Sequence, residues 1–163
     1  MRSVKYPQTL TIGRIGLISD THGLIRPQAL VALSGSELII HGGDIGSPDV
    51  LIALEKIAPV IAIRGNNDHA AWALKLPDVL SLHVNALRIV VIHNVHELNG
   101  SLKDGIRVVV SGHSHKPGIM SRDRVLFINP GSAGPRRFKL PVSVARLIVR
   151  GEKARARIVE LRI

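Results

Sequence analysis

Three short polar stretches, each directly after an apolar run, indicate the architecture of the chain: ISDTHG (Ile18–Gly23), HGGD (His41–Asp44) and RGNND (Arg64–Asp68). Short β-branched runs bounded by glycine and polar residues are typical of buried strands. We therefore predict three strands, over Ile15–Ser19, Leu38–His41 and Val60–Arg64.

Helical segments lie between these strands. Pro27–Leu33 has proline in its first turn and ends before Gly35, and a second helix runs from Pro48 to about Ile57 with Ser47 as its N-cap. Two successive β-α-β units predict parallel strands joined by right-handed crossovers.

The second half of the chain is rich in strands. A hairpin is expected around Asn85-Ala86, and tight turns at Arg122-Asp123-Arg124 and Gly151-Glu152. The predicted strands are Val79–Val84, Leu87–His93, Arg107–Ser111, Ile119–Arg122, Val125–Asn129, Val142–Arg150 and Ala154–Arg162. Many strands with few helices predict two packed sheets with helices outside. We treat residues 1–12 as a short, loosely held extension and residues 13–163 as one domain.

Composition narrows the class of protein. The 163 residues are 45% hydrophobic, enough for a folded core, and contain no cysteine, which excludes a thiol nucleophile, a Cys-ligated zinc and an iron–sulfur cluster. No apolar run approaches the ~20 residues of a membrane span, and no signal peptide is evident. We expect a cytoplasmic protein without a membrane partner.

The positive charge is concentrated in the C-terminal part. The formal net charge is +10, and basic and acidic side chains balance through residue 100, so the last 63 residues carry the whole excess. A nucleic-acid partner is one interpretation, and arginines on the solvated face of strands are the favoured one. Aromatic residues for base stacking are few.

Polar clusters end five predicted strands, and in α/β sheets ligands collect beyond the carboxyl ends of strands. The clusters contribute Asp20, His22, Asp44, Asn66, His93, His113 and His115. This set carries −2 with neutral imidazoles, so two divalent cations would leave +2, suited to a phosphate oxyanion and a bridging hydroxide. Mixed imidazole and carboxylate ligands favour Mn²⁺, Fe, Zn, Co or Ni over Mg²⁺ alone. A single such histidine is usually a structural residue, and only the ordered series of five clusters predicts a metal site.

The series ISDTHG, HGGD, RGNND, IHN and SGHSH resembles the calcineurin-like metallophosphoesterases, most of all their short bacterial and archaeal phosphodiesterases of the YfcE type. INPGSAGPRR (Ile128–Arg137) is similar to the segment that follows the double-histidine motif in those proteins. The resemblance covers about Gly13 to Ile163. It implies an α/β fold, a four-layer α/β/β/α sandwich of two mixed sheets, and hydrolysis of phosphoesters at two metals.

Carried over by motif, the resemblance places one metal with Asp20, His22, Asp44 and His115. It places the other with Asp44, Asn66, His93 and His113, so that Asp44 bridges. Two divalent ions are expected, Mn²⁺ first, with Fe, Zn, Ni or Co as alternatives.

The residues expected to assist catalysis are Asp44, Asn67 and Asp68. Asp44 or a nearby carboxylate would orient the bridging hydroxide. Asn67 stands where many members of the family have a histidine that stabilises charge or protonates the leaving oxygen. Asparagine cannot be a general acid, so activated esters are the expected substrates unless His69 or His96 donates the proton. Asp68 is expected to orient the loop or a ligating histidine. A second departure follows His93, where Asn94-Val95 replaces a frequent Gly-His.

The leading hypothesis is a metal-dependent phosphodiesterase acting on a small diester, with a cyclic or linear nucleotide ester as one candidate. The alternatives are a nuclease or RNA-processing enzyme with the same centre, and a scaffold of this fold without catalysis. Exposed strand edges also allow a homodimer. Arg136 and Arg137 are candidates for binding phosphate, with a surface role as the equal alternative. Specificity is expected from the loops Ala70–Pro77 and Val95–Asp104.

Overall fold

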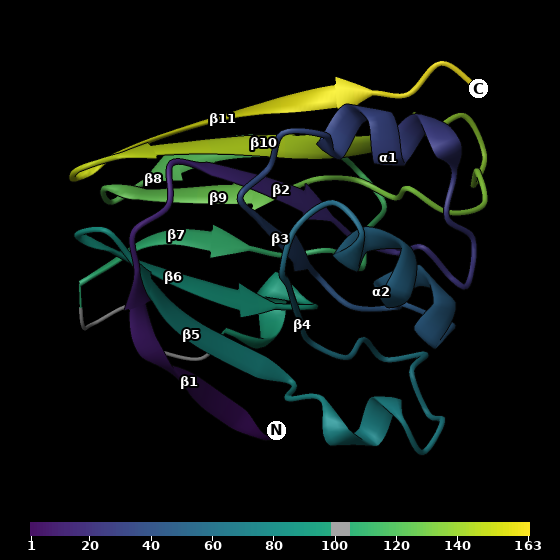
Figure 1. Ribbon diagram of the computed structural model, residues 1–163, viewed down its shortest axis with the longest axis horizontal. Coiled ribbons are helices and arrows are strands. Elements are labelled where there is room, and N and C mark those ends of the chain that lie inside the picture. Colours follow the sequence, from purple (N-terminus) through teal and green to yellow (C-terminus); the bar gives the residue numbers. More distant parts are fainter. Residues whose placement is uncertain (99–104) are drawn as a thin grey trace.

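Two mixed β-sheets pack face to face, and α-helices cover the outer face of one of them (Figure 1). The computed structural model describes residues 1–98 and 105–163. Part of the predicted specificity loop Val95–Asp104 therefore lies outside the described residues.

The five-stranded sheet has the order β11-β10-β2-β3-β4. Its strands are β2 (Arg14–Ile18), β3 (Leu38–His41), β4 (Val60–Ala62), β10 (Ser143–Arg150) and β11 (Lys153–Glu160). Strands β2, β3 and β4 are parallel, as the two β-α-β units predict, and β10 is antiparallel to both β2 and β11. The carboxyl ends of the three parallel strands therefore meet at one edge of the molecule.

The six-stranded sheet has the order β1-β5-β6-β7-β9-β8. Its strands are β1 (Ser3–Leu10), β5 (Val79–Val84), β6 (Leu87–Ile92), β7 (Ile106–Val110), β8 (Gly118–Arg122) and β9 (Val125–Asn129). The predicted hairpin joins β5 to β6, and β6, β7 and β9 run parallel. His93 follows β6, so this sheet also directs a predicted ligand to the shared edge.

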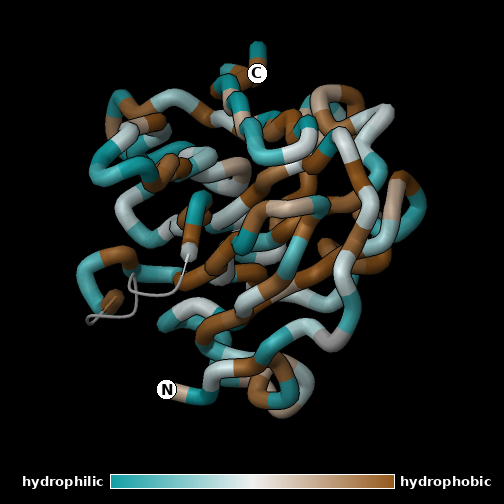
Figure 2. Tube along the Cα trace, turned by 90° about the vertical axis from the view of Figure 1, so that its left-hand side faces the viewer, coloured by the Kyte–Doolittle hydropathy of each residue, from teal (hydrophilic) through white to brown (hydrophobic). Residues whose placement is uncertain are grey.

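Three apolar clusters hold the layers together. The largest lies between the sheets and includes Leu17, Ile40 and Val91. The second packs α1 (Pro27–Leu33) and α2 (Pro48–Glu55) on the five-stranded sheet, through Leu33 and Leu54 among others. The third covers the outer face of the six-stranded sheet. Figure 2 shows the corresponding pattern, with hydrophobic residues along the interior strands and hydrophilic residues in the turns.

The predicted fold class, α/β with two mixed sheets and few helices, is confirmed, and every predicted element lies within two residues of the observed one. The Ser47 side chain caps α2 by accepting a hydrogen bond from the Asp49 backbone, as predicted. The fourth layer is thin. Among the described residues, the only helical piece in the apolar cluster on the outer face of the six-stranded sheet is the 3₁₀ turn η2 (Val95–Glu97). A second 3₁₀ turn, η1 (Ala73–Lys75), precedes β5.

One expectation about the N-terminus is wrong. Residues 1–12 are not a loose extension, because Ser3–Leu10 forms the edge strand β1, parallel to β5, with a register shift between Lys5 and Thr9. Backbone hydrogen bonds also join Asp78 and Val79 to Arg2. The partner strand β5 lies some 75 residues further along the chain, so the local sequence around β1 does not predict this pairing. The extent of the single domain stays a prediction.

No helix in residues 1–98 and 105–163 is long and apolar enough to cross a membrane. The expected cytoplasmic location is a separate prediction.

Candidate metal centre

The loops after β2 and β3 run side by side beyond the sheet. The Asp20 backbone N–H donates to Gly43 O at 3.0 Å and that of His22 to Asp44 O at 2.9 Å, which continues the parallel pairing past the strand ends. Asp20 and Asp44 are consequently neighbours, and both are buried. Their proximity is a direct consequence of the β-α-β topology.

Backbone strain is concentrated in this cluster. Only nine non-glycine residues in the described ranges have positive φ, and five of them are predicted ligands. Left-handed backbone disfavours residues with a Cβ and is retained where the surrounding structure enforces it, often at functional sites. The five ligands are Asp20, His22, Asp44, His113 and His115.

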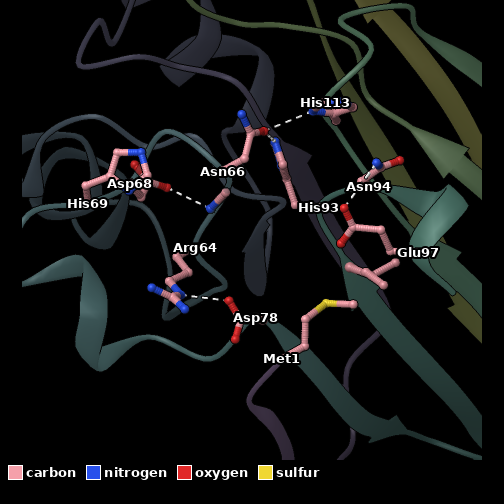
Figure 3. A pocket seen from close by; sticks show the side chains of 12 residues that line it. Met1, Arg64, Asn66, Asp68, His69, Asp78, His93, Asn94, Glu97 and His113 are labelled. Atoms are coloured by element: carbon pink, nitrogen blue, oxygen red, sulfur yellow. Dashed lines mark hydrogen bonds and ion pairs between the residues drawn. The ribbon is translucent and has the colours of Figure 1, made fainter.

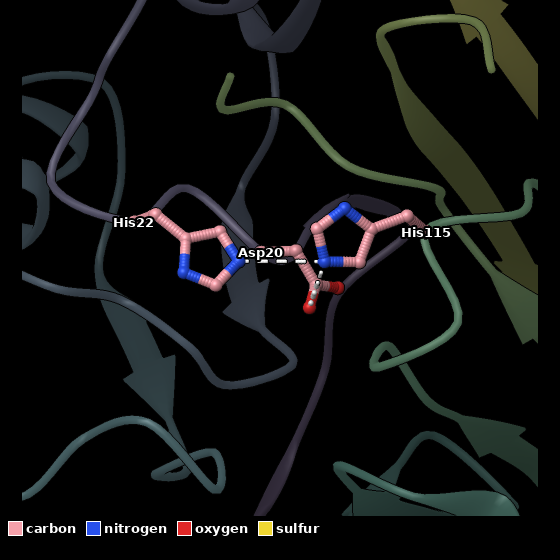
Figure 4. Close-up of side chains that lie close together, drawn as sticks. All are labelled: Asp20, His22 and His115. Carbon is pink, nitrogen blue, oxygen red and sulfur yellow. Dashed lines mark hydrogen bonds and ion pairs between the residues drawn. The ribbon is translucent and has the colours of Figure 1, made fainter. Parts of the chain in front are cut away.

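A first group of ligand atoms gathers around Asp20 (Figure 4). His115 Nε2 lies 3.3 Å from Asp20 Oδ1 and 3.3 Å from His22 Nε2. Asp20 and His22 belong to the loop after β2, and His115 belongs to the loop after β7. The two histidines are 93 residues apart in sequence. Two imidazole nitrogens and a carboxylate oxygen facing one point make up three of the four ligands predicted for the first metal.

A second group gathers around His93. Its Nε2 lies 3.5 Å from Asp44 Oδ2, 4.0 Å from Asp20 Oδ1 and 3.0 Å from Asn66 Oδ1. The same Asn66 oxygen lies 3.0 Å from His113 Nδ1 (Figure 3). All four predicted ligands of the second metal are therefore brought together.

The donor set fits divalent cations. Asp20 Oδ1 is buried and accepts no hydrogen bond within the described part of the chain, an arrangement that costs free energy unless a charged group meets it. The His22 and His115 nitrogens face each other at a distance at which one of them must carry a proton, unless a cation lies beside them. Imidazole nitrogen and carboxylate oxygen are ordinary ligands of Mn, Fe, Zn, Co and Ni.

Both carboxylates lie between the two histidine groups, whereas the resemblance placed only Asp44 there. Asp44 Oδ2 is 3.9 Å from His22 Nε2 and 3.5 Å from His93 Nε2. Asp20 Oδ1 faces His115 and His93. The geometry therefore leaves either aspartate able to bridge.

The electrostatics of the cluster keep Asp44 ionised. Burial alone would raise the pKa of Asp44, but hydrogen bonds from His93 and Asn67 outweigh it and hold that pKa well below its usual range. Burial opposes the charged form of His93, and the hydrogen bond with Asp44 raises the pKa of His93 above its ordinary value. Burial lowers the pKa of His22. A permanently ionised carboxylate beside imidazoles is what a cation site requires.

Asn67 is exposed, and it also forms two hydrogen bonds with the Asp44 carboxylate. Its backbone N–H donates to Asp44 Oδ1 at 2.8 Å, and its side-chain Nδ2 donates to Asp44 Oδ2 at 2.6 Å. Asn67 therefore orients the carboxylate.

Asp68 holds the loops in place. Its carboxylate accepts backbone N–H bonds from Ile45 at 3.0 Å and from Gly46 and Gly65 at 2.9 Å. This matches the loop-orienting alternative predicted for Asp68, because the carboxylate ties the loop after β3 to the loop after β4.

His41 and Thr21 form a hydrogen-bonded pair that holds the loops after β2 and β3 together, and the sequence did not predict this pair. Gly43 N–H donates to His41 Nδ1, so His41 Nε2 carries the proton and donates to Thr21 Oγ1 at 2.9 Å, which in turn donates to Ile45 O. Complete burial lowers the pKa of His41 to about 4, so it is neutral at pH 7. The histidine before Gly-Gly in HGGD was a sequence signal, but Thr21 offered none.

A pocket of about 400 Å³ opens beside the second group (Figure 3). Asn66, His93 and His113 line it, together with His69 and an ion pair in which Arg64 Nε lies 2.7 Å from Asp78 Oδ1. His96 lines a different pocket with Lys116 and Met120. The structure thus separates the two predicted proton donors and places only His69 beside the site. The Arg64–Asp78 pair was missed because it depends on how the loop after β4 returns to β5.

After His93 the chain enters η2, whose N-terminus is capped by Asn94 Oδ1, which accepts the His96 N–H at 3.2 Å. The departure from Gly-His thus replaces a second histidine with a helix cap and leaves His93 in position.

A two-sheet sandwich that gathers histidine, aspartate and asparagine side chains at its strand ends is an arrangement suited to a metal-dependent phosphoesterase. Residues 14–152 match the family model of the calcineurin-like phosphoesterase superfamily domain, and the chain belongs to that family. The resemblance predicted from the sequence motifs is confirmed.

Curated relatives carry names of the same kind. A probable metallophosphoesterase of Methanothermobacter thermautotrophicus is 36% identical, with 89% of this chain and 91% of the relative covered. A phosphodiesterase of Methanocaldococcus jannaschii is 33% identical, with 72% of this chain and 82% of the relative covered. These relatives indicate a hydrolase of phosphoesters.

Solved structures agree with the fold. The structure of an archaeal phosphodiesterase aligns with a TM-score of 0.75 and 27% identity, over 90% of this chain and 99% of the other. YfcE, a phosphoesterase of E. coli, aligns with a TM-score of 0.65 and 24% identity, over 82% of this chain and 87% of the other. Vps29 of Chaetomium thermophilum aligns with a TM-score of 0.72 and 19% identity, over 91% of this chain and 96% of the other. At such low identity the last two likenesses concern the fold alone.

Proposed function

We propose that this protein is a phosphodiesterase that hydrolyses a small phosphodiester at a centre of two divalent cations, with Mn²⁺ as the expected metal. The observation that carries the proposal is the position of Asp20 and Asp44 between two groups of histidines, His22 with His115 and His93 with His113. The names of the relatives favour phosphoester hydrolysis over other metal chemistry.

The seven predicted ligands would hold the two cations. When bound, paired divalent cations acidify a water molecule into a nucleophile at neutral pH and neutralise the charge that develops on the phosphate. His93 is prepared for such a role, because its Nδ1 donates to Gly42 O at 2.7 Å and leaves Nε2 free to ligate. Asn67 keeps both oxygens of Asp44 in a fixed orientation.

The leaving group needs separate help. The Asn67 amide can donate a hydrogen bond to a phosphate oxygen but cannot give up a proton. His69 lines the pocket beside Asn66 and His113 and is exposed to solvent, so it is the titratable group best placed to protonate a leaving oxygen there. Without such a donor, the preferred substrates are esters whose leaving group departs as an anion.

The test is turnover of bis-p-nitrophenyl phosphate by purified protein loaded with Mn²⁺, and again after treatment with a chelator. We expect activity that depends on added metal, is abolished by the chelator and falls at least ~10²-fold in Asp44→Asn, because an ionised carboxylate that lies between both histidine groups is lost. The matched control is Arg155→Gln, on the exposed face of β11 far from these residues. Metal-independent turnover, or full activity in Asp44→Asn, would contradict the proposal.

A further inference from the structure

An unusual turn follows the NPGS segment. Leu140 N donates to Arg137 O at 3.1 Å, which closes a turn with Phe138 near its tip. Phe138 is 94% exposed and has a φ of +52°. A bulky aromatic residue in the left-handed region is a true outlier, and full exposure means that no packing in the described structure compensates the strain. The turn therefore presents a ring to the solvent at a cost in free energy.

The segment that leads into this turn is anchored to the candidate metal centre. Ser132 Oγ donates to Asp20 O at 2.9 Å, and Ala133 N donates to Ser19 O at 3.1 Å. Gly134 lies so close that a Cβ there would meet Asp20 O at 2.6 Å, and Arg26 donates to the Gly134 carbonyl. In Figure 1 this yellow-green loop between β9 and β10 lies on the same side as α1. Four residues of chain span at most ~14 Å, so Phe138 lies within about that distance of Gly134, which packs against Asp20.

Cationic residues flank Phe138 in the sequence on both sides. Arg136, Arg137 and Lys139 are all exposed, and none of them forms an ion pair with an acidic side chain in residues 1–98 and 105–163. Arg137 also lies close enough to His22 to act on it electrostatically. An exposed aromatic ring next to cationic residues is a combination that can bind a nucleobase together with its phosphate.

We propose that this turn is a nucleotide subsite, in which Phe138 stacks on the base of a nucleoside phosphodiester while Arg136 and Arg137 bind its phosphate. The inference rests on the proposed function, since it assigns a substrate class to the same centre. Because an exposed ring stacks on any base, the subsite predicts a preference for nucleoside esters over simple alkyl esters without strong base selectivity.

The kinetic test compares two diesters that share a leaving group, thymidine 5′-(p-nitrophenyl phosphate) and methyl p-nitrophenyl phosphate. We expect the ratio of kcat/KM for the nucleoside ester over the methyl ester to fall about tenfold in Phe138→Ala, through KM, and to be restored in Phe138→Trp. The control is Val31→Ala, which removes another exposed apolar side chain, on α1, and is expected to leave the ratio unchanged. A ratio within twofold of wild type in Phe138→Ala overturns the subsite.

A binding test separates this inference from the proposed function. The 5′-monophosphate of 2-aminopurine riboside, whose fluorescence falls when its base stacks, is titrated into the protein in the presence of a chelator. We expect quenching with wild type and Phe138→Trp, and at least about fivefold weaker binding with Phe138→Ala. If the protein hydrolyses neither diester but still binds the probe through Phe138, the hydrolase proposal fails and the subsite stands. If binding is unchanged in Phe138→Ala and the oligomeric state measured by light scattering changes instead, Phe138 contacts a second copy and the subsite is overturned.

Discussion

At the scale of single residues, two glycines allow the loops to approach the carboxylates of the site. A Cβ at Gly65 would meet the Asp44 carboxyl carbon at 2.7 Å, and one at Gly112 would meet Asp20 Oδ2 at 2.6 Å. The glycines in RGNND and SGHSH are therefore part of the sequence signal of the site. The close approach to the carboxylates that requires glycine there is visible only in the structure.

Gly65→Ala is expected to displace Asp44 and to weaken binding of Mn²⁺ by about 10–100-fold, the range typical when the surroundings of a ligand are disturbed. Isothermal titration with Mn²⁺ measures this. Gly118→Ala is the control, because no atom lies within 4 Å of the added methyl group. Equal Mn²⁺ affinity in Gly65→Ala and wild type would show that Asp44 is not a ligand.

The proton donor gives a second prediction at this scale. Introducing a general acid by Asn67→His is expected to raise the rate with a diester of poor leaving group, at most ~10²-fold, and to change the rate with a nitrophenyl ester little. Equal rates for Asn67→His and wild type with the poor leaving group would show that no acid is missing at position 67, with His69 the donor already present.

The same experiment distinguishes the two histidines. His69→Ala is expected to slow hydrolysis of the poor-leaving-group ester selectively, because His69 lines the pocket of the site. His96→Ala, in the separate pocket, is the control. A selective loss in His96→Ala instead would reverse the assignment.

At the scale of elements, β1 and β5 depend on a contact that joins distant segments. Asp78 accepts a hydrogen bond from Arg64 Nε at 2.7 Å and one from the Arg2 backbone, and so ties the loop after β4 and the start of β1 to β5. Burial raises the pKa of Asp78, but these hydrogen bonds outweigh it, and the net pKa lies below the usual value.

Asp78→Asn is expected to lower the free energy of unfolding by about 1 kcal/mol at pH 7. Because the folded state has the lower pKa, the carboxylate stabilises the fold fully above its unfolded pKa of about 3.9 and loses this effect as the pH falls through the folded pKa. The difference between wild type and variant should therefore shrink below about pH 4. Urea unfolding at several pH values measures it, and a difference independent of pH would contradict the role given to the carboxylate.

Elements with local signals were predictable, and β1 was not. The strands around Ile15–Ser19 and Leu38–His41 have continuous apolar runs, and Ser47-Pro48 marks the start of α2. In Ser3–Leu10 the apolar alternation of Val4, Tyr6 and Leu10 is interrupted by Pro7 and Gln8, and the register with β5 shifts between Lys5 and Thr9. Only the non-local pairing makes this segment a strand.

The site itself was predictable to the level of which side chains meet, because strand ends in a parallel sheet converge. Which of these side chains contact one another was not predictable. That Asn67 binds Asp44, that Asp68 ties two loops together and that Asp20 also lies between both histidine groups all depend on the path of loops with positive φ. Hydrophobic periodicity carries no information about such paths.

At the scale of the whole molecule, eight of the fourteen basic residues that follow residue 100 lie in two places. One is the Phe138 turn. The other is a patch on the outer face of the five-stranded sheet, where Arg157 lies directly opposite Arg146 and Lys153 opposite Arg150. We call it the outer-sheet patch; it comprises Arg14, Arg146, Arg150, Lys153, Arg155 and Arg157. Arg14 begins β2 and Asp20 follows its end, so Arg14 lies ~20 Å from Asp20 along the strand, and Arg146, which pairs with Gly16, lies nearer to it.

This separation argues against a polyanion held by the patch during catalysis. The double variant Arg155→Glu/Arg157→Glu is expected to keep kcat/KM for bis-p-nitrophenyl phosphate within twofold of wild type, because the patch does not face the site. Binding of a single-stranded oligonucleotide, measured at several salt concentrations, should be weak in both proteins. A steep salt dependence in wild type, lost in the variant together with hydrolysis of the oligonucleotide, would instead favour the nuclease alternative.

Our central claim is that seven side chains drawn from five strand ends surround two cations. The most direct measurement is anomalous diffraction near the manganese edge from crystals grown with Mn²⁺. The account predicts two peaks per chain, one beside Asp20, His22 and His115 and one beside Asn66, His93 and His113. A single peak, or none between these groups with excess Mn²⁺ present, would contradict it.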